Sequence, residues 1–519
     1  MTVALLLLAF GLRLGNRGLF YDLFPDKVRQ MAAAGNLLRG RGISDCWADP
    51  ADVARVTCQP QTDWPSGYPI LSAAITKLSG DFIVTDAIIH AIALALVLLA
   101  AGSLIRRFHT GERSDTAYRW FLAFSAISFA PYVYLTTTDL LSLALYLTAA
   151  AVALRIAERP PALAASAAAG SLLWLAAVTR YNYVPLLACV PITFALVGIL
   201  RRDGRLFRSA ATCVAVALIL SLALRLSLPR NGALLPHSAG GGGWYPGNLR
   251  SLDPFAFKAF FYLDPVLSRL SRIIPWLDSA VLLAAQPIAL LLVAGSATWA
   301  LTRLGRQGGV DQRPLAIFMM VTLAVTVAAL AWLSLRVAPE NLPYNHRWTY
   351  LWETRYYAPF LLLLVPLAFA LASTPTTGGS AALVRGARVT VGSAVVYAVA
   401  FDLWIMWMLI GRHDLSRTSF AQPATAIRMA HQVRHLATSE DRPVVVAFPS
   451  VGEAYAAGRL RDFDFGTVRA SRPVVLLVLV SADSSRAGRV RAWLDSARAR
   501  PLVTRRSMVL YRVDVEPTP

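Results

Sequence analysis

The feature that most constrains this chain is a series of apolar stretches of about twenty residues, each with few or no charges. Residues 280–301 and 315–337 are examples, and a helix of that length crosses about 30 Å of hydrocarbon. Hydrophobic residues make up 56% of the 519 residues, and the mean hydropathy is +0.52. A single soluble core does not need so much apolar surface. The sequence therefore predicts a mainly α-helical, polytopic membrane protein.

Apolar length and flanking charge predict eleven membrane helices. They cover residues 2–20, 85–105, 120–135, 140–156, 163–178, 184–200, 210–228, 280–301, 315–337, 357–372 and 389–410. Three other stretches are long enough to act outside the membrane, namely 21–84, 229–279 and 411–519. We therefore expect a transmembrane domain over 1–410 and a separate soluble domain over 411–519.

The C-terminal stretch alternates two kinds of pattern. Helical patterns cover 424–438 and 484–497, and short apolar strands cover 443–447, 474–480 and 508–513. The longest of these strands is too short to cross a bilayer as a helix. The alternation predicts a small α/β domain.

The net charge of +20 comes mainly from arginine. Five short loops carry these arginines and alternate onto one side of the predicted helices: Arg106 and Arg107; Arg155 and Arg159; Arg201, Arg202, Arg205 and Arg208; Arg303 and Arg306; Arg385 and Arg388. The positive-inside rule makes that side cytoplasmic, so we expect a cytoplasmic N-terminus and an extracytoplasmic C-terminal domain. Arg13 and Arg17 lie toward the C-terminal end of the first predicted helix and not before it, which disagrees with this orientation. Nucleic acid is not expected as a partner, because no basic helix stands apart from the membrane segments.

Two of the four cysteines share one polar loop. If the loop containing Cys46 and Cys58 faces an oxidising compartment, a disulfide between them is one of two open alternatives, the other being free thiols. Cys189 and Cys213 lie in apolar segments and are expected to be buried as small hydrophobic side chains.

The first long loop opens with a helical pattern that starts at Asp26 and ends at Gly40. Val28, Met31, Gly35 and Leu38 recur in it at spacings of three and four, which predicts an amphipathic helix on the membrane surface. An aspartate at a helix start also has a structural explanation, because it caps free N–H groups and faces the positive end of the helix dipole.

The order of motifs around Asp26 resembles the GT-C superfamily of lipid-linked sugar transferases. A first helix ends in Leu12-Arg13-Leu14, an acidic residue follows, and the next helix ends in Leu37-Leu38-x-Gly40-x-Gly42. This is similar to the branch of protein O-mannosyltransferases and lipid A aminoarabinose transferases (glycosyltransferase families 39 and 83). Asp26 matches the position of the catalytic base in that branch.

Four later segments resemble motifs of the same branch, in the same order. They are Trp-Pro-Ser-Gly-Tyr-Pro at 64–69, a second acidic residue at Asp139, Ala-Val-Thr-Arg-Tyr at 177–181, and Glu-Thr-Arg-Tyr-Tyr-Ala-Pro at 353–359. One departure stands out. Relatives commonly carry a second acidic residue directly after the first, where this chain has Lys27, and that puts a metal site built on an acidic pair in doubt.

The resemblance implies an inverting glycosyltransferase. It would move a hexosyl or pentosyl group from a polyprenyl-phosphate donor to an acceptor hydroxyl on the extracytoplasmic face of a bacterial inner membrane. Asp26 would act as base, with Arg355 first and Arg180 and Lys258 behind it as phosphate-binding candidates. Ion pairing or lipid headgroup contact is the alternative for these cations. No cofactor is certain, although a divalent metal is compatible with the loop's other aspartates.

The sequence leaves two kinds of choice open. The acceptor is a glycolipid, a polysaccharide or a protein, and neither it nor the sugar is fixed by the motifs. A membrane transporter or a flippase for lipid-linked sugars would also explain the helices, but it would call for paired discontinuous helices near mid-membrane. A non-catalytic scaffold whose C-terminal domain binds a partner is a third interpretation.

Overall fold

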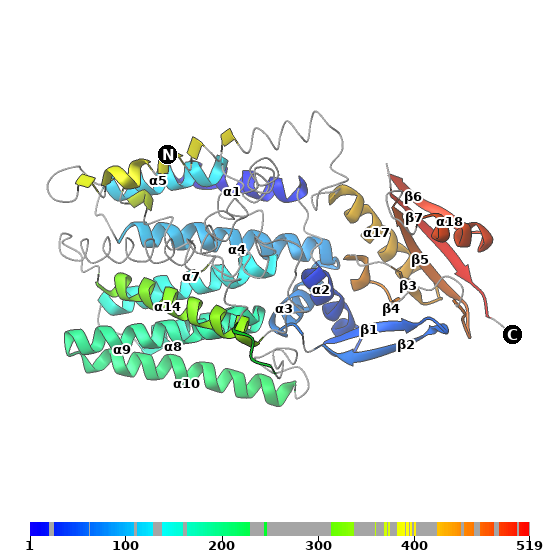
Figure 1. Cartoon of the computed structure of the whole chain (residues 1–519), viewed down its shortest axis with the longest axis horizontal. Coiled ribbons are helices and arrows are strands. Elements are labelled where there is room, and N and C mark those ends of the chain that lie inside the picture. Colours follow the sequence, from blue (N-terminus) through cyan, green and yellow to red (C-terminus); the bar gives the residue numbers. More distant parts are fainter. Residues whose placement is uncertain are drawn as a thin grey trace. The chain divides into compact units, whose positions relative to one another are not determined.

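The computed structural model divides the chain into two compact units (Figure 1). A helical unit comprises residues 1–14 and 90–407, and a mixed α/β unit comprises 15–89 and 408–519. The structure describes residues 1–19, 25–61, 63–107, 112–127, 137–158, 163–228, 243–246, 313–336, 359, 368–370, 372–373, 381–382, 384–389, 391–393, 395–396, 399–400, 423–447, 451–460, 468–481, 487–505 and 508–517.

Most helices of the helical unit coincide with predicted membrane segments, but the predicted span 120–135 is met only in part, by a helix that begins at residue 112. The elements of this unit are α1 (Thr2–Leu19), which begins in it, the main part of α4 (Phe82–Ile105), α5 (Glu112–Ile127), α7 (Thr137–Glu158), α8 (Leu163–Thr179), α9 (Cys189–Arg201), α10 (Gly204–Ser227) and α14 (Arg313–Arg336). Two short 3-10 turns, η1 (Tyr181–Tyr183) and η2 (Pro185–Ala188), precede α9. In the described part of the chain, five segments are long and apolar enough to cross a membrane. The predicted spans at 280–301, 357–372 and 389–410 lie wholly or mostly outside the described residues.

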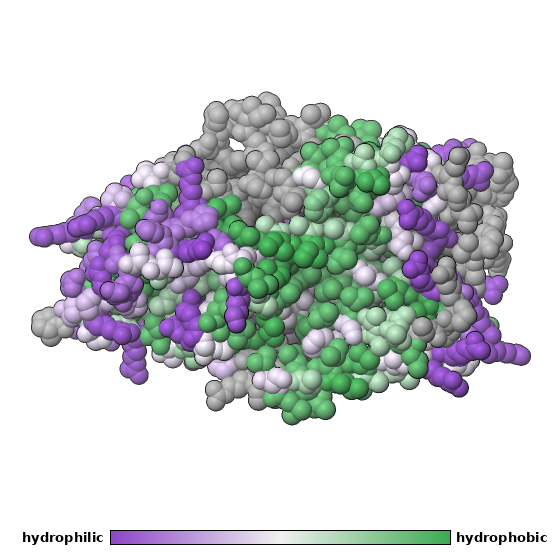
Figure 2. Space-filling model, turned by 180° about the vertical axis from the view of Figure 1, so that it is seen from behind, coloured by the Kyte–Doolittle hydropathy of each residue, from purple (hydrophilic) through white to green (hydrophobic). Residues whose placement is uncertain are grey.

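Small residues let these helices pack closely. A Cβ on Gly170 of α8 would lie 2.8 Å from the carbonyl oxygen of Cys213 in α10, so glycine fits where a larger residue would push the two helices apart. By contrast, α10 exposes Leu218, Ile219 and Leu222. Hydrophobic side chains also gather in a broad area on the face of this unit that Figure 2 displays. Side chains of that kind suit contact with lipid.

The α/β unit is built on one seven-stranded sheet with the order β2-β1-β4-β3-β5-β7-β6. The strands are β1 (Ser44–Asp49), β2 (Asp52–Pro60), β3 (Val444–Val446), β4 (Gly458–Leu460), β5 (Val474–Ser481), β6 (Arg500–Arg505) and β7 (Met508–Val515). Strands β1, β4, β3 and β5 run parallel, and the pairs β1–β2, β5–β7 and β6–β7 are antiparallel.

Helices cover both faces of this sheet. On one face α17 (Pro423–Ser439) packs through Val433 against Val475 and Leu477 of β5. On the other, α18 (Ala487–Ser496) packs through Leu494 against the core that includes Leu476. Successive residues of β5 point to opposite faces, so the unbroken apolar run 474–480 is the pattern expected of a strand buried on both sides.

The sheet combines strands from two segments that the sequence analysis had assigned to different domains. The helix and strand patterns expected after residue 410 correspond to α17, α18, β3, β5 and β7, whereas β1 and β2 come from the first loop. Trp47 and Ala48 of β1 pair with Arg459 and Leu460 of β4. This pairing covers an edge of β4 that would otherwise expose unpaired backbone groups. The first loop therefore belongs to the same folded unit as the C-terminal segment.

Two further helices of this unit come from the first loop, α2 (Pro25–Leu38) and α3 (Gly67–Ser79). The spacing of apolar residues predicted α2, and its end at Gly40 is confirmed by a left-handed φ of 75° there. The sequence predicted that the apolar face of α2 would lie on the membrane surface, but the structure packs this face inside the protein. Val28 and Met31 are buried, because α2 packs against α3, β1 and the 3-10 turn η10 (Val451–Ala454).

Candidate functional site

Asp26 is the second residue of α2 and lies in its first turn. Its side chain is partly exposed, and its backbone carbonyl accepts a hydrogen bond from Gln30 Nε2 at 3.2 Å. The first-turn position places the carboxylate near the N-terminal, positive end of the helix dipole. The geometry is that of an accessible carboxylate fixed on a buried helix.

Arg29 lies three residues after Asp26 and therefore on the same side of α2. Its guanidinium carbon lies 5.1 Å from the ring centroid of Trp64, in the Trp-Pro-Ser-Gly-Tyr-Pro segment. Its Nε is buried and has no hydrogen-bond partner among the residues that the structure describes. Sequence reasoning did not single out Arg29, although the i, i+3 spacing from Asp26 was a usable signal. A carboxylate and a guanidinium thus share one helix face.

Lys27 explains the departure from the family pattern. Its ammonium group donates to Asp86 Oδ2 at 3.1 Å, and both side chains are fully buried. The Tyr68 hydroxyl donates to the other oxygen of Asp86 at 2.8 Å. A second acid at position 27 would meet Asp86 without a compensating cation. The lysine therefore points into the protein and ties α2 to the start of α4.

Asp139 and Arg180 are brought together within the helical unit. Asp139 lies in the first turn of α7, and Arg180 follows the last residue of α8. Arg180 Nε lies 2.7 Å from Asp139 Oδ1, and their side chains are 7% and 1% exposed. The second acidic candidate and one phosphate candidate thus form a buried ion pair, as the ion-pair alternative for Arg180 anticipated.

The other phosphate candidates, Arg355 and Lys258, lie outside the described residues, as does Asp22. The first-loop aspartates Asp45, Asp49 and Asp63 have partners or are exposed. Asp45 lies 3.9 Å from Arg459, Asp49 accepts from the Ala51 amide, and Asp63 is exposed. Among the described residues, no cluster of three or more His, Cys, Asp or Glu side chains could hold a metal ion.

Cys46 and Cys58 form a disulfide across the β1–β2 hairpin, where they stand directly opposite each other. Of the two alternatives that the sequence left open, the structure has the bonded one. Cys189 and Cys213 are buried free thiols, as expected.

The sequence matches no model of a known protein family and no curated protein. Among solved structures it is similar to the crystal structure of ArnT from Cupriavidus metallidurans bound to undecaprenyl phosphate, with a TM-score of 0.47 and 15% identity over 98% of this chain and 97% of that one. The apo state of ArnT gives a TM-score of 0.48 at the same identity and coverage. An oligosaccharyltransferase from Archaeoglobus fulgidus, in complex with Zn and sulfate, gives 0.47 and 12% identity over 95% of this chain and 69% of that one.

Proposed function

We propose that the chain is an inverting glycosyltransferase that moves one sugar from a polyprenyl-phosphate donor to an acceptor hydroxyl outside the cytoplasm. The observation that carries the proposal is the Asp26–Arg29 face of α2, with Arg29 stacked on Trp64. The ordered sequence motifs that surround Asp26 support it. The acceptor class is a glycolipid, a polysaccharide or a protein, and the transferred group is a hexose or a pentose.

The chemistry requires a base and cations. Asp26 takes the proton of the acceptor hydroxyl while its oxygen attacks the anomeric carbon from the face opposite the phosphate. The bond from that carbon to the phosphate oxygen breaks, and the polyprenyl phosphate leaves with the bonding electrons, which inverts the anomeric centre. Phosphate monoesters are already ionised at neutral pH, so no general acid is needed. A positioned base typically contributes about 10²- to 10⁴-fold.

Cations hold the departing phosphate. We keep Arg355 as the first candidate, with Lys258 and Arg180 behind it, and place Arg180 last because Asp139 already engages it. Arg29 joins this set by its position one turn from Asp26. Guanidinium groups suit the role because they donate in a fixed fork that matches phosphate oxygens.

Two features of the α/β unit support an extracytoplasmic site. The Cys46–Cys58 disulfide favours an oxidising compartment for the first loop. Because β1 pairs with β4, the first loop and the C-terminal segment must lie on the same side of the membrane. That agrees with the ten membrane helices predicted between them, since an even number returns the chain to the side it left. We propose a multi-pass bacterial inner-membrane protein with a cytoplasmic N-terminus.

The test is Asp26→Asn in cells that otherwise lack the protein. Mass spectrometry of their envelope glycolipids and glycoproteins should show one sugar mass restored by the wild-type chain and not by the variant. Asp441→Asn, which changes an exposed aspartate in the α/β unit, is the matched control and should restore it. An Asp26→Asn variant with near wild-type transfer would remove Asp26 from the mechanism. Counterflow of a lipid-linked sugar across vesicles, without any covalent product, would identify a flippase instead.

A further inference from the structure

The C-terminal half of α2 meets the turn at 451–457 at very close range. A Cβ added to Gly35 would lie 2.0 Å from the carbonyl oxygen of Ala454 and 2.9 Å from its carbonyl carbon. Both atoms belong to the backbone, so they cannot move aside as the end of a flexible side chain could. Glycine at position 35 is therefore required by the contact and not by the helix, which would favour alanine.

Two arginines at the end of α2 bind carbonyls of the same turn. Arg39 Nη1 donates to the Ala454 carbonyl at 2.9 Å, and Arg41 Nη1 donates to the Ala457 carbonyl at 2.6 Å. Arg39 Nη2 also donates to Asn36 Oδ1 at 2.8 Å. Burial, with a smaller contribution from Arg41, lowers the pKa of Arg39 to about 10. Hydrogen bonds donated by charged groups are stronger than neutral ones, so charge as well as shape holds the contact.

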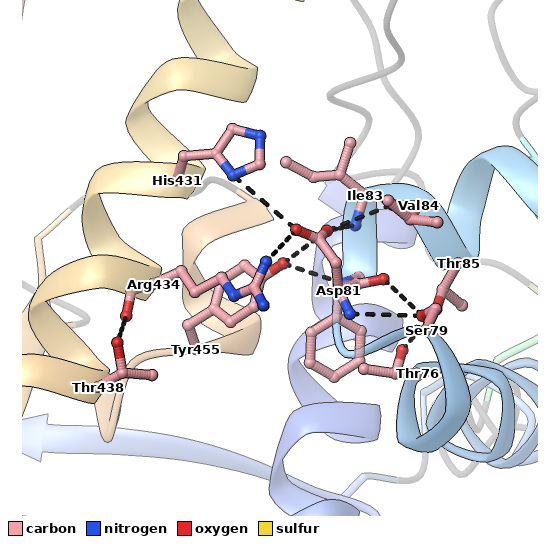
Figure 3. A network of polar contacts seen from close by, with 11 residues as sticks. Thr76, Ser79, Asp81, Ile83, Val84, Thr85, His431, Arg434, Thr438 and Tyr455 are labelled. Carbon is pink, nitrogen blue, oxygen red and sulfur yellow. Dashed lines mark hydrogen bonds and ion pairs between the residues drawn. The ribbon is translucent and has the colours of Figure 1, made fainter.

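The same turn is held at a second point, before α4 (Figure 3). The Tyr455 hydroxyl donates to Asp81 Oδ1 at 3.0 Å and accepts from the Phe82 amide at 2.9 Å. Arg434 of α17 forms an ion pair with the other carboxylate oxygen of Asp81. Asp81 also caps α4, accepting from the Ile83 amide at 2.6 Å. The turn is thus fixed to the end of α2 and to the start of α4.

From these contacts we infer that the C-terminal segment 423–517 positions the candidate base, because its turn at 451–457 holds the C-terminal end of helix α2 and, through that helix, the position of Asp26. This inference rests on the proposed function. Asp26 lies nine residues before Gly35 in one continuous helix, or about 14 Å at 1.5 Å per residue. Because a continuous helix is stiff, a displacement of its backbone at Gly35 also displaces Asp26. A misplacement of about 1 Å at a reacting group can cost about 10²-fold in rate.

Gly35→Ala in the full-length chain tests this. Gly11→Ala is the matched control, because Gly11 is also helical and a Cβ there meets nothing within 4 Å. Arg39→Lys is a milder second variant. It keeps the positive charge but cannot donate to both the Ala454 carbonyl and Asn36 Oδ1 as the guanidinium does. The donors are polyprenyl-phosphate sugars extracted from the membranes of the producing cells, and product is measured by mass spectrometry per folded molecule.

We expect Gly35→Ala to lower kcat about 10²-fold and Arg39→Lys to lower it about tenfold, with the KM for donor within about threefold of wild type. Hydrogen exchange in residues 25–38 should rise in both variants and stay unchanged in Gly11→Ala. A purely structural role would instead reduce the folded fraction while each folded molecule turns over at the wild-type rate. That result, or wild-type kcat in both variants, would overturn the inference.

Asp26→Asn in the same assay separates the two proposals. If Asp26→Asn is inactive and Gly35→Ala is normal, the positioning inference alone fails. If the wild-type chain transfers no sugar, or Asp26→Asn remains active, the proposed function or its base fails first, and the positioning inference fails with it.

Discussion

Lys27 Nζ donates a hydrogen bond to Asp86 Oδ2 at 3.1 Å, and neither side chain is exposed to solvent. The pair joins the first turn of α2 to the first turns of α4, 59 residues apart in sequence. It lies directly beside the candidate base. Removing the pair and measuring the stability of the protein therefore tests whether this ion pair holds the part of α2 that carries Asp26.

Lys27→Met should destabilise the protein by about 3–5 kcal/mol, because it leaves the buried Asp86 carboxylate without its cation. Lys27→Glu, which introduces the second acid of the motif that the sequence resembles, should destabilise it further by placing two carboxylates together. Lys77→Met, at an exposed lysine of α3, should have little effect. Thermal unfolding of the detergent-solubilised protein measures all three.

Lys27→Met/Asp86→Asn should recover most of the lost stability, since no uncompensated charge remains and the amide oxygen still accepts from the Tyr68 hydroxyl. If Lys27→Met alone unfolds at the wild-type temperature, the ion pair is not what holds α2 to α4.

Arg180→Ala should also cost about 3–5 kcal/mol, because Asp139 would stay buried without its partner. Asp139→Asn/Arg180→Met removes both charges and should restore stability. If Arg180 serves mainly as the partner of Asp139, the double variant will bind the polyprenyl phosphate of the proposed reaction within about threefold of wild type. A double variant that folds but does not bind the lipid would instead assign Arg180 to the phosphate.

The stability of the α/β unit should depend on the ionisation of Asp52. Asp52 Oδ1 accepts hydrogen bonds from the backbone amides of Ser471 at 2.9 Å and Ala54 at 3.1 Å. The bond from Ser471 is the main cause that holds the pKa of Asp52 below its ordinary value of 3.8. A carboxyl group whose pKa is lower in the folded state stabilises the fold above its unfolded pKa. That stabilisation is lost as the pH falls below 3.8 and through the lower folded value.

Asp52→Asn keeps an acceptor oxygen but cannot titrate. Its thermal midpoint should be lower than that of wild type at pH 7, and the difference should shrink as the pH falls below 3.8. Midpoints measured between neutral pH and about pH 2.5 follow this difference. A difference that stays constant over that range would show that the charge of Asp52 does not contribute.

Several parts of this structure could be predicted from local patterns. Apolar length predicted α4, α7, α8, α10 and α14, because a helix crossing lipid must satisfy its own backbone hydrogen bonds over a fixed span. Short β-branched runs predicted β3, β5 and β7. Gly40 and Gly42 marked the end of α2, and both have positive φ values that glycine adopts at little cost.

Other parts depend on partners that are distant in sequence. The strands β1 and β2 were missed because 44–60 is polar and becomes a hairpin in a sheet whose neighbouring strand β4 begins at residue 458. The pairing of Lys27 with Asp86, and that of Arg180 with Asp139, had no local signal either. A charged side chain within an apolar pattern indicates that a partner of opposite charge is needed, but the sequence spacing does not identify that partner.

The sequence by itself determined that the chain crosses a membrane, where α4, α7, α8, α10 and α14 lie, and that Asp26 starts a helix in a loop with a recognisable order of motifs. These properties depend on length, periodicity and local backbone chemistry. Only the tertiary structure decided that the first loop and the C-terminal segment share one sheet, and that Gly35 meets Ala454. Strand pairing and close backbone contact are set by segments more than 400 residues apart, and no local pattern encodes which of them meet.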